Sequence, residues 1–84
     1  MIWEIAYSDE ARNYLYDSYP YTEAVLIEIE RLRLTKDAVP SEGCTQIEPN
    51  IYMWDVLQHM VLFEKVTDAT KPKLKILIVK PLEL

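Results

Sequence analysis

Three apolar runs fill the second half of the chain, and they restrict its fold more than any other feature. They cover residues 51–57, 60–66 and 73–80. The first two runs meet at the polar residues Gln58 and His59, which predicts a β-hairpin, and the stretch TDATKP separates the second run from the third. We therefore expect three consecutive strands. Alternation with a period of two predicts that one face of the last strand consists of Leu74, Ile76 and Ile78.

The first half of the chain predicts one strand and two helices. The opening segment MIWEIAYS alternates as a strand with one more buried face does. Ser8 precedes two acidic residues and predicts a helix start, and Pro20 disfavours helix at the residue before it. A second helix is expected from about residue 20 or 22 to residue 34. The order β-α-α-β-β-β predicts a single domain over residues 1–84, an α+β fold whose antiparallel-rich sheet is covered on one face by a helical hairpin.

The composition argues against several kinds of site. A formal net charge of -5 argues against a protein that holds nucleic acid mainly through its phosphates, so nucleic acid is not expected as the main ligand. One cysteine and one histidine cannot build a structural zinc site, and a single glycine excludes a glycine-rich phosphate loop. We expect no metal and no cofactor. Because the chain has neither a signal-peptide pattern nor an apolar run of about 18 residues, we expect a cytoplasmic, soluble protein without a membrane segment.

Asp55 and His59 form the sharpest candidate pair for proton transfer. Across a tight hairpin turn they would lie on neighbouring strands, within a cross-strand reach of about 5 to 8 Å between Cβ atoms. The carboxylate could then orient and charge the imidazole, as a general acid or base requires. The alternative is a surface contact between Asp55 and His59 that only closes the hairpin.

An unusual number of aromatic side chains gathers around the expected helical turn. Four tyrosines are more than a short helix can bury, so we expect them to form a contact surface together with a tryptophan of the hairpin. Interleaved basic residues, which stacking on nucleic acid bases would favour, are missing. The residues expected to bind a protein partner are Tyr14, Tyr16, Tyr19, Tyr21 and Trp54.

The layout of the chain resembles the RelE/ParE toxin superfamily of bacterial toxin–antitoxin systems. The segment WEIAYSDEARNYL is similar to the family's opening strand and first helix, and PSEG is similar to its proline-glycine loop. The segment YMWDVLQHMVLFEKV resembles the central hairpin, and LKILIVKPL resembles the last strand. The resemblance covers nearly the whole chain and implies a RelE-like fold.

The same resemblance implies where catalytic groups would stand. In RNA-cleaving members, basic side chains on the sheet bind mRNA and perform acid–base catalysis. The two basic positions of the first hairpin strand correspond to Met53 and Asp55, and the arginine that opens the second strand corresponds to Met60. The side chains left as catalytic candidates are His59, Asp55, Lys65 and Lys80. Removing one cation that stabilises such a transition state commonly costs on the order of 100-fold in rate. We therefore expect no ribosome-dependent ribonuclease of the usual kind.

Three functions follow from the resemblance as expectations. The first is a toxin-superfamily protein that acts by binding a protein, either a cognate antitoxin or a target such as gyrase, without cleaving mRNA. The second is a non-toxic, degenerate member that serves as a binding or regulatory module. The third is a residual ribonuclease that uses His59 and Asp55. A homodimer is compatible with the small core and the tyrosine surface.

Overall fold

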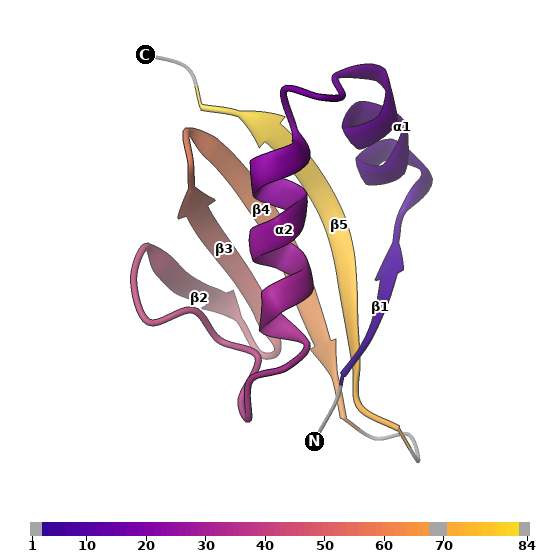
Figure 1. Cartoon of the computed structure of the whole chain (residues 1–84). Coiled ribbons are helices and arrows are strands. Elements are labelled where there is room, and N and C mark those ends of the chain that lie inside the picture. The colour runs from indigo at the N-terminus through magenta and orange to yellow at the C-terminus, as the bar shows by residue number, and fades with distance from the viewer. Residues whose placement is uncertain (1–2, 68–70, 83–84) are drawn as a thin grey trace.

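The computed structural model describes residues 3–67 and 71–82 and forms an α+β fold, as the sequence predicts (Figure 1). The described residues form two helices and five strands, and the five strands make one mixed sheet. The order in the sheet is β1-β5-β4-β3-β2, with β1 parallel to β5 and the other neighbours antiparallel. The elements are β1 (Glu4–Tyr7), α1 (Asp9–Asp17), α2 (Glu23–Leu32), β2 (Cys44–Glu48), β3 (Ile51–Val56), β4 (His59–Val66) and β5 (Lys73–Pro81).

The strand β2 is one more than the sequence predicts. It pairs with β3, and its residues are mostly exposed because it forms an edge of the sheet. The segment CTQIE has a single strongly apolar residue, Ile47, so it shows no hydrophobic alternation. The pairing is stabilised by the glycine loop before it: Gly43 adopts a φ of +71° and its carbonyl accepts a hydrogen bond of 2.8 Å from the Asp55 N–H. A Cβ atom at Gly43 would lie 2.6 Å from the Asp55 carbonyl oxygen, so only glycine fits.

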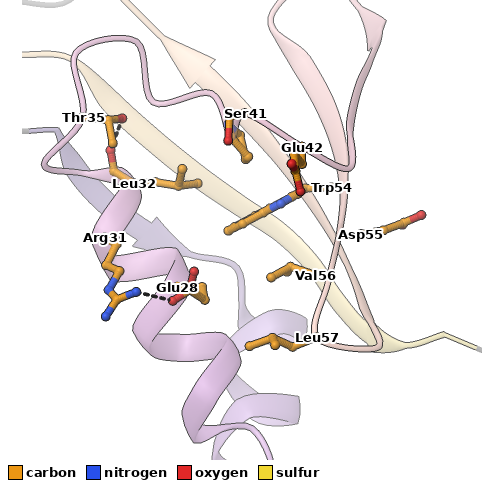
Figure 2. Close-up of a pocket in the computed structure, with 11 residues that line it drawn as sticks. Glu28, Arg31, Leu32, Thr35, Ser41, Glu42, Trp54, Asp55, Val56 and Leu57 are labelled. Carbon is orange, nitrogen blue, oxygen red and sulfur yellow. Dashed lines mark hydrogen bonds and ion pairs between the residues drawn. The ribbon is translucent and has the colours of Figure 1, made fainter.

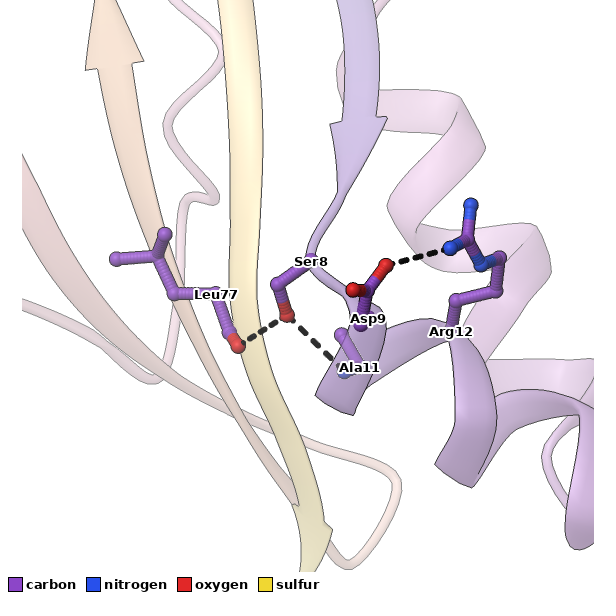
Figure 3. A network of polar contacts seen from close by, with 5 residues as sticks. All are labelled: Ser8, Asp9, Ala11, Arg12 and Leu77. Atoms are coloured by element: carbon purple, nitrogen blue, oxygen red, sulfur yellow. Dashed lines mark hydrogen bonds and ion pairs between the residues drawn. The ribbon is translucent and has the colours of Figure 1, made fainter.

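Helix α1 begins where the sequence predicts it. The Ser8 hydroxyl oxygen accepts a hydrogen bond of 3.0 Å from the Ala11 N–H, which satisfies one free donor of the first turn (Figure 3). The same hydroxyl donates to the Leu77 carbonyl at 2.6 Å, so Ser8 also ties the helix to β5. Asp9 and Arg12 form an exposed ion pair on this turn, which adds little stability by itself.

One face of the sheet packs against both helices and forms the core. The buried strand residues alternate along β4, where Val61 and Phe63 are fully buried, and they contact Val25 and Ile29 of α2 in a single cluster. Figure 1 shows α2 lying along this face and α1 beside it near β5. We call the opposite side of the sheet, which the helices do not cover, the open face. Its central residues are Ile51, Met53, Asp55, Met60, Leu62, Glu64, Lys75, Ile78 and Lys80.

A β-bulge at Leu77 changes which side chains of β5 are buried. Leu62 pairs with Ile78 while its neighbour Phe63 pairs with Ile76, so Leu77 has no partner in β4. The expectation that Ile78 shares a face with Ile76 is therefore wrong. Val79 is buried in its place, and Ile78 lies on the open face beside Leu62.

The turn between β3 and β4 lies one residue earlier than the polar pair suggests. Leu57 and Gln58 occupy it with φ values of 50° and 63°, and His59 is the first residue of β4. Positive φ at both central residues is the geometry that matches the twist of a two-residue hairpin, although asparagine and glycine are the usual residues there. Because side chains alternate along a strand, this shift of one residue decides the face on which His59 lies.

Candidate functional site

The positions to which the resemblance assigns basic catalytic groups lie together on the open face. Asp55 pairs with Met60, and Met60 pairs with Lys80, so the three form one row across β3, β4 and β5. Met53 lies in the next row, opposite Leu62. The strands therefore bring together the positions that correspond, by the resemblance, to basic catalytic groups. Lys80 supplies the only cation among Met53, Asp55, Met60 and Lys80, and Asp55 supplies a negative charge.

His59 does not lie on this surface, and the expected approach of Asp55 to His59 is wrong. His59 pairs with Val56 and points to the core side, where it is 1% exposed, whereas Asp55 points to the open face. Its Nδ1 lies 3.0 Å from the Leu57 carbonyl oxygen, and its Nε2 lies 2.9 Å from the Tyr14 hydroxyl. A carbonyl only accepts, so Nδ1 donates, and in the neutral ring Nε2 accepts from Tyr14. Both nitrogens are engaged in the fold, and neither faces an incoming substrate.

Tyr14 and Tyr21 complete the surroundings of this imidazole. Their ring centroids lie 5.8 Å and 5.2 Å from the centroid of His59, in tilted arrangements. Burial raises the pKa of Tyr14 above its usual value, and the neighbouring Tyr21 phenol raises it further. The cluster joins α1, the link between the helices and the start of β4. We infer that it holds the helices on the hairpin.

Lys65, another catalytic candidate, also points to the core side. Its Nζ lies 5.4 Å from the ring centroid of Trp3 and 5.5 Å from that of Tyr52, which are cation–π distances. Lys65 therefore packs at the end of the core, away from Lys80. Cys44 lies close enough for Lys65 to favour its thiolate, but burial is the larger effect and raises the pKa of the thiol.

The aromatic residues expected to form a contact surface divide into two groups. Tyr16, Tyr19 and Tyr21 are 75%, 59% and 62% exposed, as the expected contact surface requires. Tyr14 is half-buried against His59. Trp54 is 6% exposed and belongs to the core, so placing it on a surface with the tyrosines is wrong. Its position between two residues that point to the open face explains its burial, because alternation puts it under α2.

Trp54 forms part of a hollow of about 380 Å³ between α2 and β3 (Figure 2). In Figure 2 the indole points toward Leu32 of α2, whereas Asp55 points away from the hollow. On the helix side, Arg31 and Glu28 form an ion pair of 2.9 Å at its rim. The hollow therefore has an apolar floor and a charged border, and it lies on the helix side of β3, whereas the side chain of Asp55 points to the open face.

A larger hollow of about 530 Å³ lies beside the two helices, and we call it the tyrosine groove. Its lining residues are Tyr7, Arg12, Leu15, Tyr16, Tyr19, Leu26 and Glu30. The Tyr7 hydroxyl donates to the Glu30 carboxylate at 2.8 Å, and burial together with this carboxylate raises the pKa of Tyr7 well above its usual value. Exposed Ile27 and Leu34 continue the apolar surface along α2 beyond Leu26.

Within residues 3–67 and 71–82, no group of three histidine, cysteine, aspartate or glutamate side chains is placed to hold a metal ion. No helix in the part of the chain that the structure describes is both long and apolar enough to cross a membrane.

No protein-family model and no curated protein matches the sequence. The RelE/ParE resemblance, the cytoplasmic location and the protein partner therefore stay predictions.

Sequence reasoning did not find the His59 cluster or the tyrosine groove as such. The signal for the first was present, because a lone histidine among aromatic residues next to a turn is typical of a satisfied core residue. The signal for the second was the pair of exposed tyrosines near the end of α1, but the contribution of Leu26 and Glu30 from α2 depends on how the helices pack.

Proposed function

We propose that this chain is a RelE/ParE-like protein that acts by binding another protein, an antitoxin or a target such as gyrase, and that it does not cleave mRNA. The order of the elements and the mixed sheet are compatible with the RelE-like fold that the resemblance implies.

The observation that carries the proposal is the chemistry of the open face. Met53, Asp55 and Met60 occupy the positions where the resemblance implies cations, and the strand pairing brings two of them into one row with Lys80. Cleavage of a phosphodiester develops negative charge that preorganised cations must stabilise. Asp55 instead repels the phosphate, and the two methionines offer no hydrogen-bond donor. His59 does not replace them because it is buried on the other side of the sheet.

The tyrosine groove supports binding as the alternative to cleavage. Tyr16 and Tyr19 stand exposed at its rim, and Leu15 and Leu26 line it. Tyrosines that expose an apolar ring and a polar hydroxyl are enriched at protein interfaces. An amphipathic helix or extended segment of a partner would bury an apolar side chain in this hollow, and Arg12 and Glu30 would contact its polar neighbours.

The test is induction of the chain alone in bacteria, with growth, mRNA integrity and plasmid supercoiling followed in the same culture. Growth arrest with intact mRNA supports the proposal, and a change in supercoiling identifies gyrase as the target. Arrest with cleaved mRNA overturns it. Normal growth in the presence of folded protein rejects the toxin and leaves the non-toxic binding module.

A pair of variants connects the effect to the groove. Changing Tyr16 and Tyr19 together to aspartate places two charges at the rim, and we expect the arrest to disappear while the fold is retained. Ile47→Asp is the matched control, because Ile47 is also an exposed apolar residue, 50% exposed, but lies on the edge strand β2. Equal loss of the arrest in both variants would contradict a role of the groove.

A further inference from the structure

The open face presents a regular grid of side chains from its three central strands. Each row of the grid contains one residue of β3, one of β4 and one of β5, in that order across the sheet. The rows are Asp55, Met60 and Lys80; then Met53, Leu62 and Ile78; then Ile51, Glu64 and Lys75. The middle of the grid is apolar, and the charges lie toward its borders.

The charges on the two borders of this grid have opposite signs. On the β3 side the charged residue is Asp55, and on the β5 side the charged residues are Lys75 and Lys80. Among the ion pairs of the described residues, none contains Asp55, Lys75 or Lys80. Within residues 3–67 and 71–82, these three side chains therefore have no oppositely charged group within ion-pair distance.

We propose that the open face binds the open face of a second copy of this chain, so that two sheets form a sandwich around a twofold axis along β4. Rotation about such an axis lays β5 of each copy over β3 of the other, while the rows keep their level. Asp55 then meets the partner's Lys80, and Met53 meets the partner's Ile78. Met60 and Leu62 meet their own counterparts near the axis. The same patch serves both copies, as an isologous interface requires.

The geometry of stacked sheets allows these contacts. Sheets that pack face to face lie about 10 Å apart and align within about 30°. An angle of about 30° between the two sheets shifts β3 and β5 by only about 2 to 3 Å from the strands that they face. The shift is small because neighbouring strands are about 4.8 Å apart. The long side chain of Lys80 spans that displacement. Glu64 meets the partner's Glu64 at the third row, where Lys75 is the cross-strand neighbour of each carboxylate and offsets the repulsion.

A second copy fits this surface better than nucleic acid does. Phosphates would meet Asp55 and Glu64 on two of the three rows, and the row between them offers only apolar side chains. A second copy instead supplies an apolar row for the apolar row and a lysine for the aspartate. The grid covers about 10 Å across three strands and about 13 Å along three rows. Because this grid is much smaller than a standard interface of roughly 800 Å² per partner, we expect weak, reversible association with a Kd of about 10 to 500 μM.

The proposal is tested by sedimentation equilibrium from about 1 to 500 μM with variants that reverse the paired charges. Asp55→Lys and Lys80→Asp each place like charges opposite one another at two symmetric points, and each is expected to raise Kd about tenfold or more. The double variant restores opposite charges and is expected to return Kd to near that of the unaltered chain. Asp17→Lys, an exposed change on α1, is the net-charge control and is expected to leave Kd unchanged.

Two results would overturn the sandwich. One is a monomer at every concentration up to about 500 μM. The other is a dimer whose Kd ignores both single reversals or is not restored by the double reversal. Circular dichroism of each variant checks that the fold is retained, and the substituted side chains are exposed. The inference is independent of the proposed function, because the tyrosine groove lies on the helix side.

Discussion

The covered and open faces of the sheet are built from alternate residues of the same strands, yet their side chains differ in what they contribute. On the covered face, residues such as Val61 and Phe63 contact helix residues and are fully buried. On the open face, Met60 and Leu62, their immediate neighbours in β4, are partly exposed. Residues that are neighbours in the sequence therefore have different roles: those on the covered face stabilise the fold, and those on the open face are available for recognition.

The largest expected difference between the faces concerns Phe63 and Leu62. Phe63→Ala leaves a cavity in the core and is expected to cost about 3 to 5 kcal/mol of unfolding free energy, most of the stability of a domain this small. Leu62→Ala, one residue away, is expected to cost less than about 1 kcal/mol. Urea denaturation at low protein concentration measures both. Similar losses for the two variants would show that the open face is also packed against something.

Asp55 and His59 provide the second test of the comparison. His59→Ala is expected to cost about 2 to 4 kcal/mol, because it removes a buried ring and leaves the Leu57 carbonyl and the Tyr14 hydroxyl without their partner. Tyr14→Phe, which keeps the aromatic ring and loses one hydrogen bond, is expected to cost about 1 kcal/mol. Asp55→Ala is expected to change stability by no more than about 0.5 kcal/mol. A His59→Ala variant as stable as the original chain would contradict the structural role.

A smaller, pH-dependent effect on stability is expected at Tyr7, which lies at the rim of the covered face. Its raised pKa means that the folded protein retains the phenol proton at a pH where the unfolded chain has lost it. The contribution is fully present below about pH 10, the unfolded value, and is lost as the pH rises through the folded pKa. Tyr7→Phe is expected to cost about 1 kcal/mol at pH 7 and to show a shallower loss of stability between pH 10 and 11.

Urea denaturation at pH 8, 10 and 11 gives the comparison for Tyr7, and Tyr16→Phe serves as its control. Tyr16 is also a tyrosine of this region but is 75% exposed. We expect the Tyr16 variant to follow the original chain at every pH. Parallel pH profiles for Tyr7→Phe and the original chain would contradict the assignment.

The smallest effect on stability per substituted site is expected from placing basic residues on the open face. The combined variant Met53→Lys, Asp55→Arg and Met60→Arg is expected to fold, with a change of no more than about 0.5 kcal/mol per site. Its affinity for RNA is expected to rise and to fall steeply with salt, because lysine and arginine contact phosphates. Fluorescence anisotropy with a labelled RNA measures this. Val61→Arg, adjacent to Met60 but fully buried, is the control and is expected to unfold the chain.

Much of the fold was predictable because it follows from local patterns. The alternation in β1, the apolar runs that form β3 and β4 and the capping role of Ser8 are properties of short segments, and the structure contains each of these elements. The faces of residues after a bulge or a turn were not predictable in the same way. Nothing in KLKILIVK marks Leu77 as the unpaired residue, because the bulge depends on its contacts with Ser8 and β4.

The candidate site was predictable as a set of positions but less so as a set of side chains in contact. Met53, Asp55 and Met60 lie together because their strands pair directly. His59 was assigned to the wrong face because Leu57 carries no signal for a positive φ, so the turn was placed one residue too late. Trp54 looked like a surface aromatic only because the sequence does not show what α2 covers.

The parallel pairing of β1 with β5 has a consequence for folding during synthesis. Glu4 pairs with Lys73 and Tyr7 with Ile76. The strand β1 is synthesised first, but it cannot pair with β5 until β5, the last strand, has been synthesised. During translation, α1 also lacks β5, the strand with which it makes most of its contacts. The hairpin of β3 and β4 joins two adjacent segments, so its own pairing is complete earlier. We therefore expect the nascent chain to expose its core-forming side chains until β5 has emerged, which makes this stage of synthesis the one most open to aggregation.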